Sequence, residues 1–176
     1  MRRLRIGILD LIATRPTHSP YARLMHPNFH SIMPQAVGVW AEELGHDVHY
    51  LSFTGSENLR RTLPSDIDLL FVGSFTPSAY LAYAISSLYR SQGVVTVLGG
   101  PHARAYAEDA RLHFDYVLGL VDKPLIRDLL QGFSRHRALG VRLGALRQPE
   151  TVPSLRQRWR FTRHNLDKAP LNGVVM

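Results

Sequence analysis

Two short stretches hold the side chains best suited to bind a ligand, and each directly follows an apolar run. GSFTPS, residues 73–78, carries the hydroxyl groups of Ser74 and Thr76 beside a predicted helix start. GGPHA, residues 99–103, combines two glycines, a proline and a histidine. Free amides at a helix start favour a polar or anionic group, and glycines remove β-carbons where a ligand lies against the backbone. We expect a large ligand, with a tail that passes between strands, at this site.

Motifs of the common nucleotide-binding and hydrolytic sites are missing. The first apolar run continues as DLIATRP, without the glycines of a dinucleotide-binding turn, and no GxxxxGK[ST] loop occurs. A receiver domain would need an acidic residue at the end of the third strand, where Gly73 and Ser74 stand. The sequence has no GxSxG or HExxH motif and no carboxylate pair at a fixed spacing. We therefore assign no catalytic residue, and whether the chain forms part of an enzyme stays open.

Cysteine is absent from the chain, which excludes a disulfide framework, a thiolate metal site and a cysteine nucleophile. His26 and His30 are four residues apart, with His18 nearby, but no carboxylate or thiolate cluster joins them, so we predict no metal site. Asp10 interrupts the first apolar run, and no apolar stretch is long enough to cross a bilayer. We expect a cytoplasmic protein that contacts no membrane.

Strand and helix patterns alternate between residues 5 and 131. The unbroken apolar run from Val94 to Leu98 is typical of a strand buried on both faces of a parallel sheet. The alternation predicts a three-layer α/β/α fold, a doubly wound, flavodoxin-like parallel sheet of five strands in the order 2-1-3-4-5, with a ligand crevice at the carboxyl ends of strands one, three and four. Strands are expected at residues 5–11, 48–53, 67–73, 94–98 and 116–118. Helices are expected from Ser31 to Leu44, at 57–63, from an N-cap at Thr76 to Gly93, at 104–113, and from Asp122 or Lys123 to Gln131.

The net charge of +7 is confined to the end of the chain. Residues 1–132 carry twelve basic and twelve acidic side chains, whereas residues 133–176 carry nine basic and two acidic ones. We interpret residues 1–132 as one binding domain and residues 133–176 as an irregular basic linker or docking arm. The arm contains Trp159 and Phe161, and arginine-rich extensions of this kind more often pack on a partner domain than bind nucleic acid.

The block from Gly73 to Gly119 resembles cobalamin-binding domains, above all the amino-terminal domain of cobalamin-dependent radical S-adenosylmethionine enzymes. In that family a strand ends in a small or hydroxyl residue, and the next strand ends in GGPH, as here; a strand like FDYVLG follows. The resemblance covers most of residues 5–130. It implies a Rossmann-like domain that binds cobalamin, with contacts to the corrinoid tail at Ser74, Thr76, Gly99, Gly100, Pro101 and His102. Further contacts to the corrin are expected from Asp10, Leu11, Ile12 and Phe75.

Two departures from the family pattern refine this expectation. The DxHxxG motif that supplies a histidine ligand to cobalt is absent after the first strand, so we expect binding without such a ligand. The CxxxCxxC motif for an iron–sulfur cluster is also absent. The resemblance therefore implies that the cluster and S-adenosylmethionine belong to a radical domain elsewhere in a parent chain or in a partner.

Simpler interpretations of the same residues stay open. Ser74 and Thr76 also suit helix capping, the two glycines suit a tight turn, and Asp10 suits local amide capping. An alternative function is a ligand-free doubly wound interaction domain whose basic arm binds protein or nucleic acid. A third is a small-molecule enzyme, such as a nucleotide-sugar transferase, that uses the same crevice.

Overall fold

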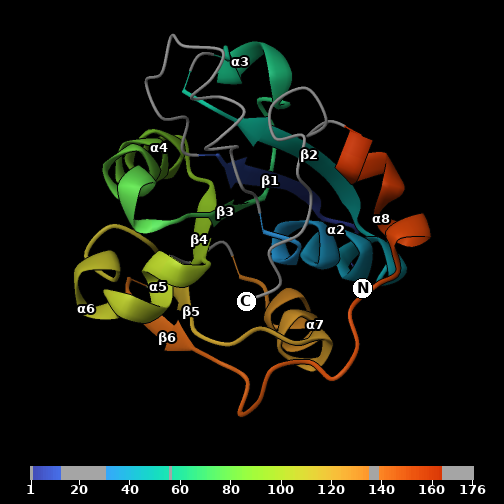
Figure 1. The fold of residues 1–176 in the computed structure, drawn as a ribbon. Coiled ribbons are helices and arrows are strands. Elements are labelled where there is room, and N and C mark those ends of the chain that lie inside the picture. The colour runs from blue at the N-terminus through green and yellow to red at the C-terminus, as the bar shows by residue number, and fades with distance from the viewer. Residues whose placement is uncertain (1, 13–30, 56, 135–138, 164–176) are drawn as a thin grey trace, which may run out of the picture.

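Six parallel strands form the centre of the molecule in a computed structural model that describes residues 2–12, 31–55, 57–134 and 139–163 (Figure 1). The sheet order is β2-β1-β3-β4-β5-β6, and every neighbouring pair is parallel. The first five strands confirm the predicted flavodoxin-like order. The strands are β1 (Arg5–Leu11), β2 (Asp47–Phe53), β3 (Leu69–Gly73), β4 (Val95–Gly99), β5 (Tyr116–Leu118) and β6 (Val141–Leu143).

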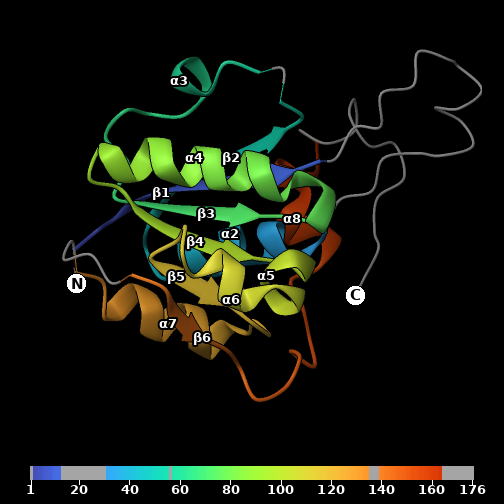
Figure 2. The ribbon, with the colours of Figure 1, turned by 90° about the vertical axis from the view of Figure 1, so that its left-hand side faces the viewer.

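Helices cover both faces of the sheet, as predicted for a three-layer fold. One face is covered by α4, α5 and α6, and the other by α2, α7 and α8; in Figure 2, α4 lies in front of the strands. Alternate residues of each strand therefore enter two separate apolar clusters. The helices are α2 (Met33–Glu43), α3 (Leu59–Thr62), the 3-10 turn η1 (Thr76–Ser78), α4 (Ala79–Ser91), α5 (Pro101–Ala105), α6 (Ala107–Ala110), α7 (Lys123–Gln131) and α8 (Leu155–Thr162).

The structure confirms some of the predicted helix boundaries and corrects others. Asp122 caps α7 by accepting a hydrogen bond from the backbone N–H of Leu125, at 2.9 Å. Gly45 follows α2 with a φ of 87°, as a helix-ending glycine should. Thr76 is not an N-cap, because it opens a 3-10 turn and its side chain caps no amide. The helix expected at 104–113 begins earlier and divides into α5 and α6 at Tyr106, whose backbone leaves the helical region.

The basic arm is not irregular where the structure describes it. It adds β6 as a sixth strand beside β5, and α8 packs against α2. Phe161 of α8 is 3% exposed, and its ring lies 2.9 Å from the position that a β-carbon on Gly38 of α2 would take. Arg158 and Thr162 both donate hydrogen bonds to Oε1 of the buried Gln35, at 2.8 and 2.9 Å. This part of the arm therefore belongs to the folded body.

The aspartate of the FDYVLG stretch has a structural role. Asp115 is fully buried, and its Oδ2 accepts hydrogen bonds from the backbone N–H and the hydroxyl of Thr96, at 2.8 and 3.1 Å. Its Oδ1 lies 3.2 Å from Nε of Arg90 on α4. These contacts tie the beginning of β5 to β4 and α4, at the end of the sheet opposite the predicted site.

Candidate functional site

A cavity of about 140 Å³ lies at the carboxyl ends of β1, β3, β4 and β5, on the face covered by α2. Its walls are mainly apolar: Ile8, Phe71 and Leu118 come from the strands, and Pro34 and Val37 come from α2. Parallel α/β sheets bind ligands at the carboxyl ends of neighbouring strands whose following helices cover opposite faces of the sheet. Here β1 is followed by α2 on one face, and β3 is followed by α4 on the other. The cavity therefore stands where the strand order predicts a ligand.

Two glycines make room for the cavity. Gly73 and Gly99 pair in register at the ends of β3 and β4. Each lies two residues after a residue of the α2-side cluster, Phe71 or Val97, so both face α2. A β-carbon on Gly73 would stand 2.8 Å from Cγ of Pro34, so α2 fills that space. A β-carbon on Gly99 would meet no described atom within 4 Å. Of these two glycines, Gly99 is therefore the one that leaves space for a ligand among the described residues.

Gly100 serves the backbone turn rather than the cavity space. Its φ is 97°, and a β-carbon there would stand 2.8 Å from the carbonyl oxygen of Ser74. That carbonyl also accepts a hydrogen bond from the backbone N–H of His102, at 3.2 Å. Gly100 thus allows the start of α5 to approach the end of β3. A residue with a β-carbon would adopt this backbone conformation only with strain.

The polar side chains that line the cavity belong to Asp10, Ser31, Ser74, Arg104 and Gln148. Asp10 at the end of β1 is 1% exposed, and its Oδ2 accepts a hydrogen bond from the hydroxyl of Tyr50 at 2.8 Å. The hydroxyl of Ser74 donates to the carbonyl oxygen of Phe75 at 2.9 Å. Arg104 of α5 lies at the rim and makes no ion pair with any of the described residues. The site thus combines apolar walls with one buried carboxylate and one cation.

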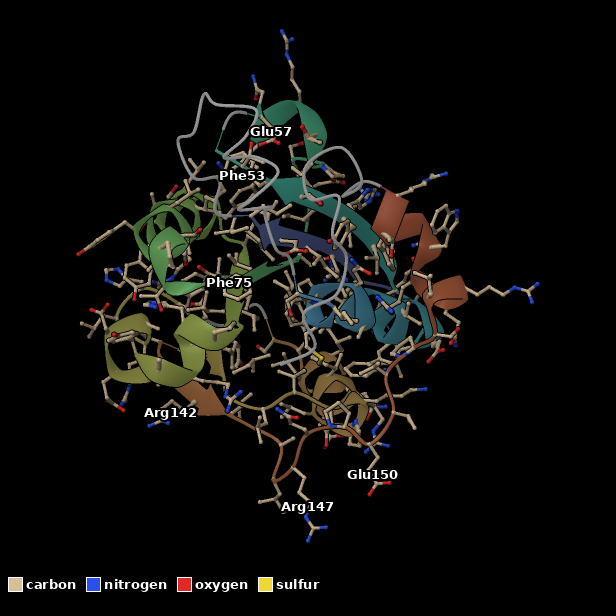
Figure 3. All side chains as sticks on the ribbon, viewed as in Figure 1. Phe53, Glu57, Phe75, Arg142, Arg147 and Glu150 are labelled. Atoms are coloured by element: carbon tan, nitrogen blue, oxygen red, sulfur yellow. The ribbon has the colours of Figure 1, made fainter. Side chains whose placement is uncertain are left out.

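The structure divides the predicted site residues into two groups. In Figure 3, Phe75 lies between α4 and α5 at this end of the molecule. Leu11 packs in the opposite cluster because its side chain points to the α4 face, and neither Ile12 nor the exposed Thr76 lines the cavity. The predicted residues that line the cavity are Asp10, Ser74, Phe75, Gly99, Gly100 and Pro101. His18, His26 and His30 lie outside the described residues.

His102 points away from the cavity, toward α4 and α6. Its Nε2 lies 2.7 Å from the hydroxyl of Tyr83, which donates a hydrogen bond to Oδ2 of Asp109 at 2.6 Å. Burial lowers the pKa of the His102 imidazole, although the charge of Asp109 opposes that shift. The same burial, with the bond to Asp109, raises the pKa of the Tyr83 hydroxyl. In this structure the histidine of GGPH anchors α5 to its neighbours.

Several cavity residues were not predicted from the sequence. Pro34 and Arg104 lie in segments predicted to be helices, and no motif marks either of them as a cavity residue. Gln148, Pro149 and Val152 also line the cavity, from the connection between β6 and α8. That connection has no apolar periodicity, so the sequence contains no signal that it returns to the sheet end.

Comparisons with known proteins identify no relative: no family model, no curated protein and no solved structure matches the chain. Over the described ranges, no helix is long and apolar enough to span a membrane. The same ranges contain no group of three histidine, cysteine, aspartate or glutamate side chains that could hold a metal ion.

Proposed function

We propose that this chain is a corrinoid-binding module that holds cobalamin by its dimethylbenzimidazole tail. The observation that carries the proposal is the open position at Gly99, inside an apolar cavity at the carboxyl ends of the parallel strands. A flat, apolar ring needs a space of this kind. The GGPHA stretch that resembles cobalamin-binding domains supplies the same glycine.

The size and lining of the cavity fit the tail of the ligand. Its volume of about 140 Å³ is below the ~300 Å³ at which sites for whole drug-sized molecules begin, so it suits one ring system and not a corrin. Ile8, Phe71 and Val37 would contact the faces of that ring. Arg104 at the rim offers a cation for the phosphodiester of the tail.

The role of this chain is binding and orientation. When bound, cobalamin supplies methyl-transfer or radical chemistry at its cobalt, together with a radical S-adenosylmethionine domain of a parent chain or a partner. Asp10 and Ser74 are held by Tyr50 and by the Phe75 carbonyl, so both are fixed before a ligand enters. The cavity residues would exclude water from the buried tail.

Retention of hydroxocobalamin after desalting tests the proposal. The purified chain should keep about one corrinoid per polypeptide, measured by its visible absorption. Gly99→Val should lose it, because the new side chain enters the cavity without meeting the protein. Thr76→Val is the matched control, since Thr76 is exposed outside the cavity and the change should leave retention intact. No retention by the folded parent, or equal retention by Gly99→Val, would contradict the proposal.

The alternative of a ligand-free domain with a basic binding arm has less support. Arg158 donates to Gln35, and Arg160 pairs with Glu42 on α2. These arginines are therefore engaged with the body of the protein.

A further inference from the structure

A second cavity lies on the opposite side of the strand ends from α2. It has a volume of about 410 Å³, is open to solvent, and is lined by α5 and α6 on one side and by β5, β6 and the residues after β6 on the other. Arg104, Gly119 and Leu120 line both this cavity and the first one. The two cavities therefore meet at Arg104.

Small side chains keep the second cavity open. Ala103 and Ala107 form the helix side, and Gly144 and Ala145 form the side after β6. A β-carbon on Gly144 would make only ordinary contacts, the nearest at 3.7 Å to Cα of Gly119. The volume lies within the range of ~300–1,000 Å³ typical of small-molecule sites.

Two arginines approach this cavity from opposite walls. Arg142 pairs in register with Val117, so its side chain points to the face covered by α5 and α6, and Figure 3 shows it at this edge of the sheet. Its Nη1 lies 3.1 Å from Oε1 of Glu108 on α6. Arg104 comes from α5 and forms no ion pair within the described ranges. The cavity is thus lined by two cations and bordered by one carboxylate.

We propose that the second cavity binds a phosphate group, free or as a phosphate monoester, between Arg104 and Arg142. A tetrahedral dianion presents oxygens in several directions, so guanidinium groups on two walls can each donate to different oxygens. A carboxylate carries one negative charge and two oxygens, against two charges and three free oxygens in a phosphate monoester, so it gains less from two guanidinium groups. The apolar small residues between the walls give the rest of an ester room without competing for the charge.

Glu108 provides a second test of the phosphate site, because its carboxylate lies beside Arg142. Its carboxylate bonds to Arg111 and Arg142, and these cations hold its pKa below the usual range, so it stays charged. A charged Glu108 competes with an entering anion for Arg142. Removing that charge should therefore strengthen phosphate binding.

The experiment is a titration of the full chain with inorganic phosphate at constant ionic strength, followed by the NMR signals of the arginine Nε–H groups. Arg104 and Arg142 should shift together and saturate at millimolar phosphate, whereas acetate should bind more weakly. Arg104→Gln and Arg142→Gln should each weaken binding about tenfold, the effect of one charge-assisted hydrogen bond. Arg127→Gln, at an exposed position of α7 away from this cavity, is the matched control and should change nothing. Glu108→Gln should strengthen binding by up to about fivefold.

Each outcome decides the proposal, with circular dichroism checking that every variant folds. Saturable binding lost in the two cavity variants alone supports it. No saturable binding by the parent, equal loss in Arg127→Gln, acetate binding as tight as phosphate, or weaker binding by Glu108→Gln would overturn it. No corrinoid enters the titration, so the result is independent of hydroxocobalamin retention.

Discussion

Replacing Phe161 by alanine tests whether the basic arm is part of the folded body. Phe161 lies on α8, 29 residues after the predicted domain boundary at residue 132, yet it is only 3% exposed. The ring packs against Gly38 of α2, and its centroid lies 5.2 Å from that of Tyr50 on β2. The truncation leaves this part of the core without its aromatic side chain.

The expected loss in the free energy of unfolding is about 3 kcal/mol. Buried Phe→Ala changes cost about 3–5 kcal/mol, because apolar contacts are lost and a cavity remains. The lower end applies here because α8 can detach from α2 instead of leaving the cavity empty. Detachment limits the loss to the free energy that holds α8 in place, which also includes the bonds of Arg158 and Thr162 to Gln35.

Urea unfolding of the parent, Phe161→Ala and Trp159→Ala measures this difference. Trp159 is the matched control, because it is an aromatic residue on the same helix but is 52% exposed. Its replacement should change the stability by no more than about 0.5 kcal/mol, as is usual for surface positions. If Phe161→Ala were as stable as Trp159→Ala, α8 would not be docked as described, and the arm would be a linker after all.

Two further predictions concern the turn after β4 and the pH dependence of stability. Gly100→Ala should destabilise the protein by about 1–3 kcal/mol, because of its positive φ and the clash with Ser74, while Gly99→Ala should stay within about 0.5 kcal/mol; urea unfolding compares them. His46 is buried, its Nδ1 accepts from the backbone N–H of Leu4 at 3.1 Å, and burial lowers its pKa. As the pH falls through about 6.5, the unfolded chain takes up the proton first. Stability should therefore fall from about pH 7.5 to 5.5, and fall less in His46→Asn; equal slopes would contradict this role.

The regular elements were predictable because their signals are local. Val94 to Leu98 could only be a buried strand, and Asp122 with Pro124 marks a helix start whose cap the structure contains. β6 gave no such signal, because its three residues are at a sheet edge and are largely exposed. β6 pairs with β5 through backbone hydrogen bonds, which do not depend on a particular side-chain pattern.

The candidate site was predictable only in part, because neighbouring residues of one motif point in different directions. Gly99 opens the cavity, Gly100 makes the turn, and His102 turns to Tyr83 on α4, a partner that no motif indicates. Strand alternation separates Asp10 from Leu11 in the same way. Gln148, Pro149 and Val152 reach the cavity from the connection that leads to α8, and no motif in the sequence indicates that α8 docks on α2.

Calorimetric titration of the full chain with hydroxocobalamin tests the central claim most directly. We predict saturable binding of one corrinoid per chain, weakened at least about tenfold by Gly99→Val, since a filled cavity cannot accept the tail. A folded parent that takes up no corrinoid, or a Gly99→Val variant with unchanged affinity, would contradict the account.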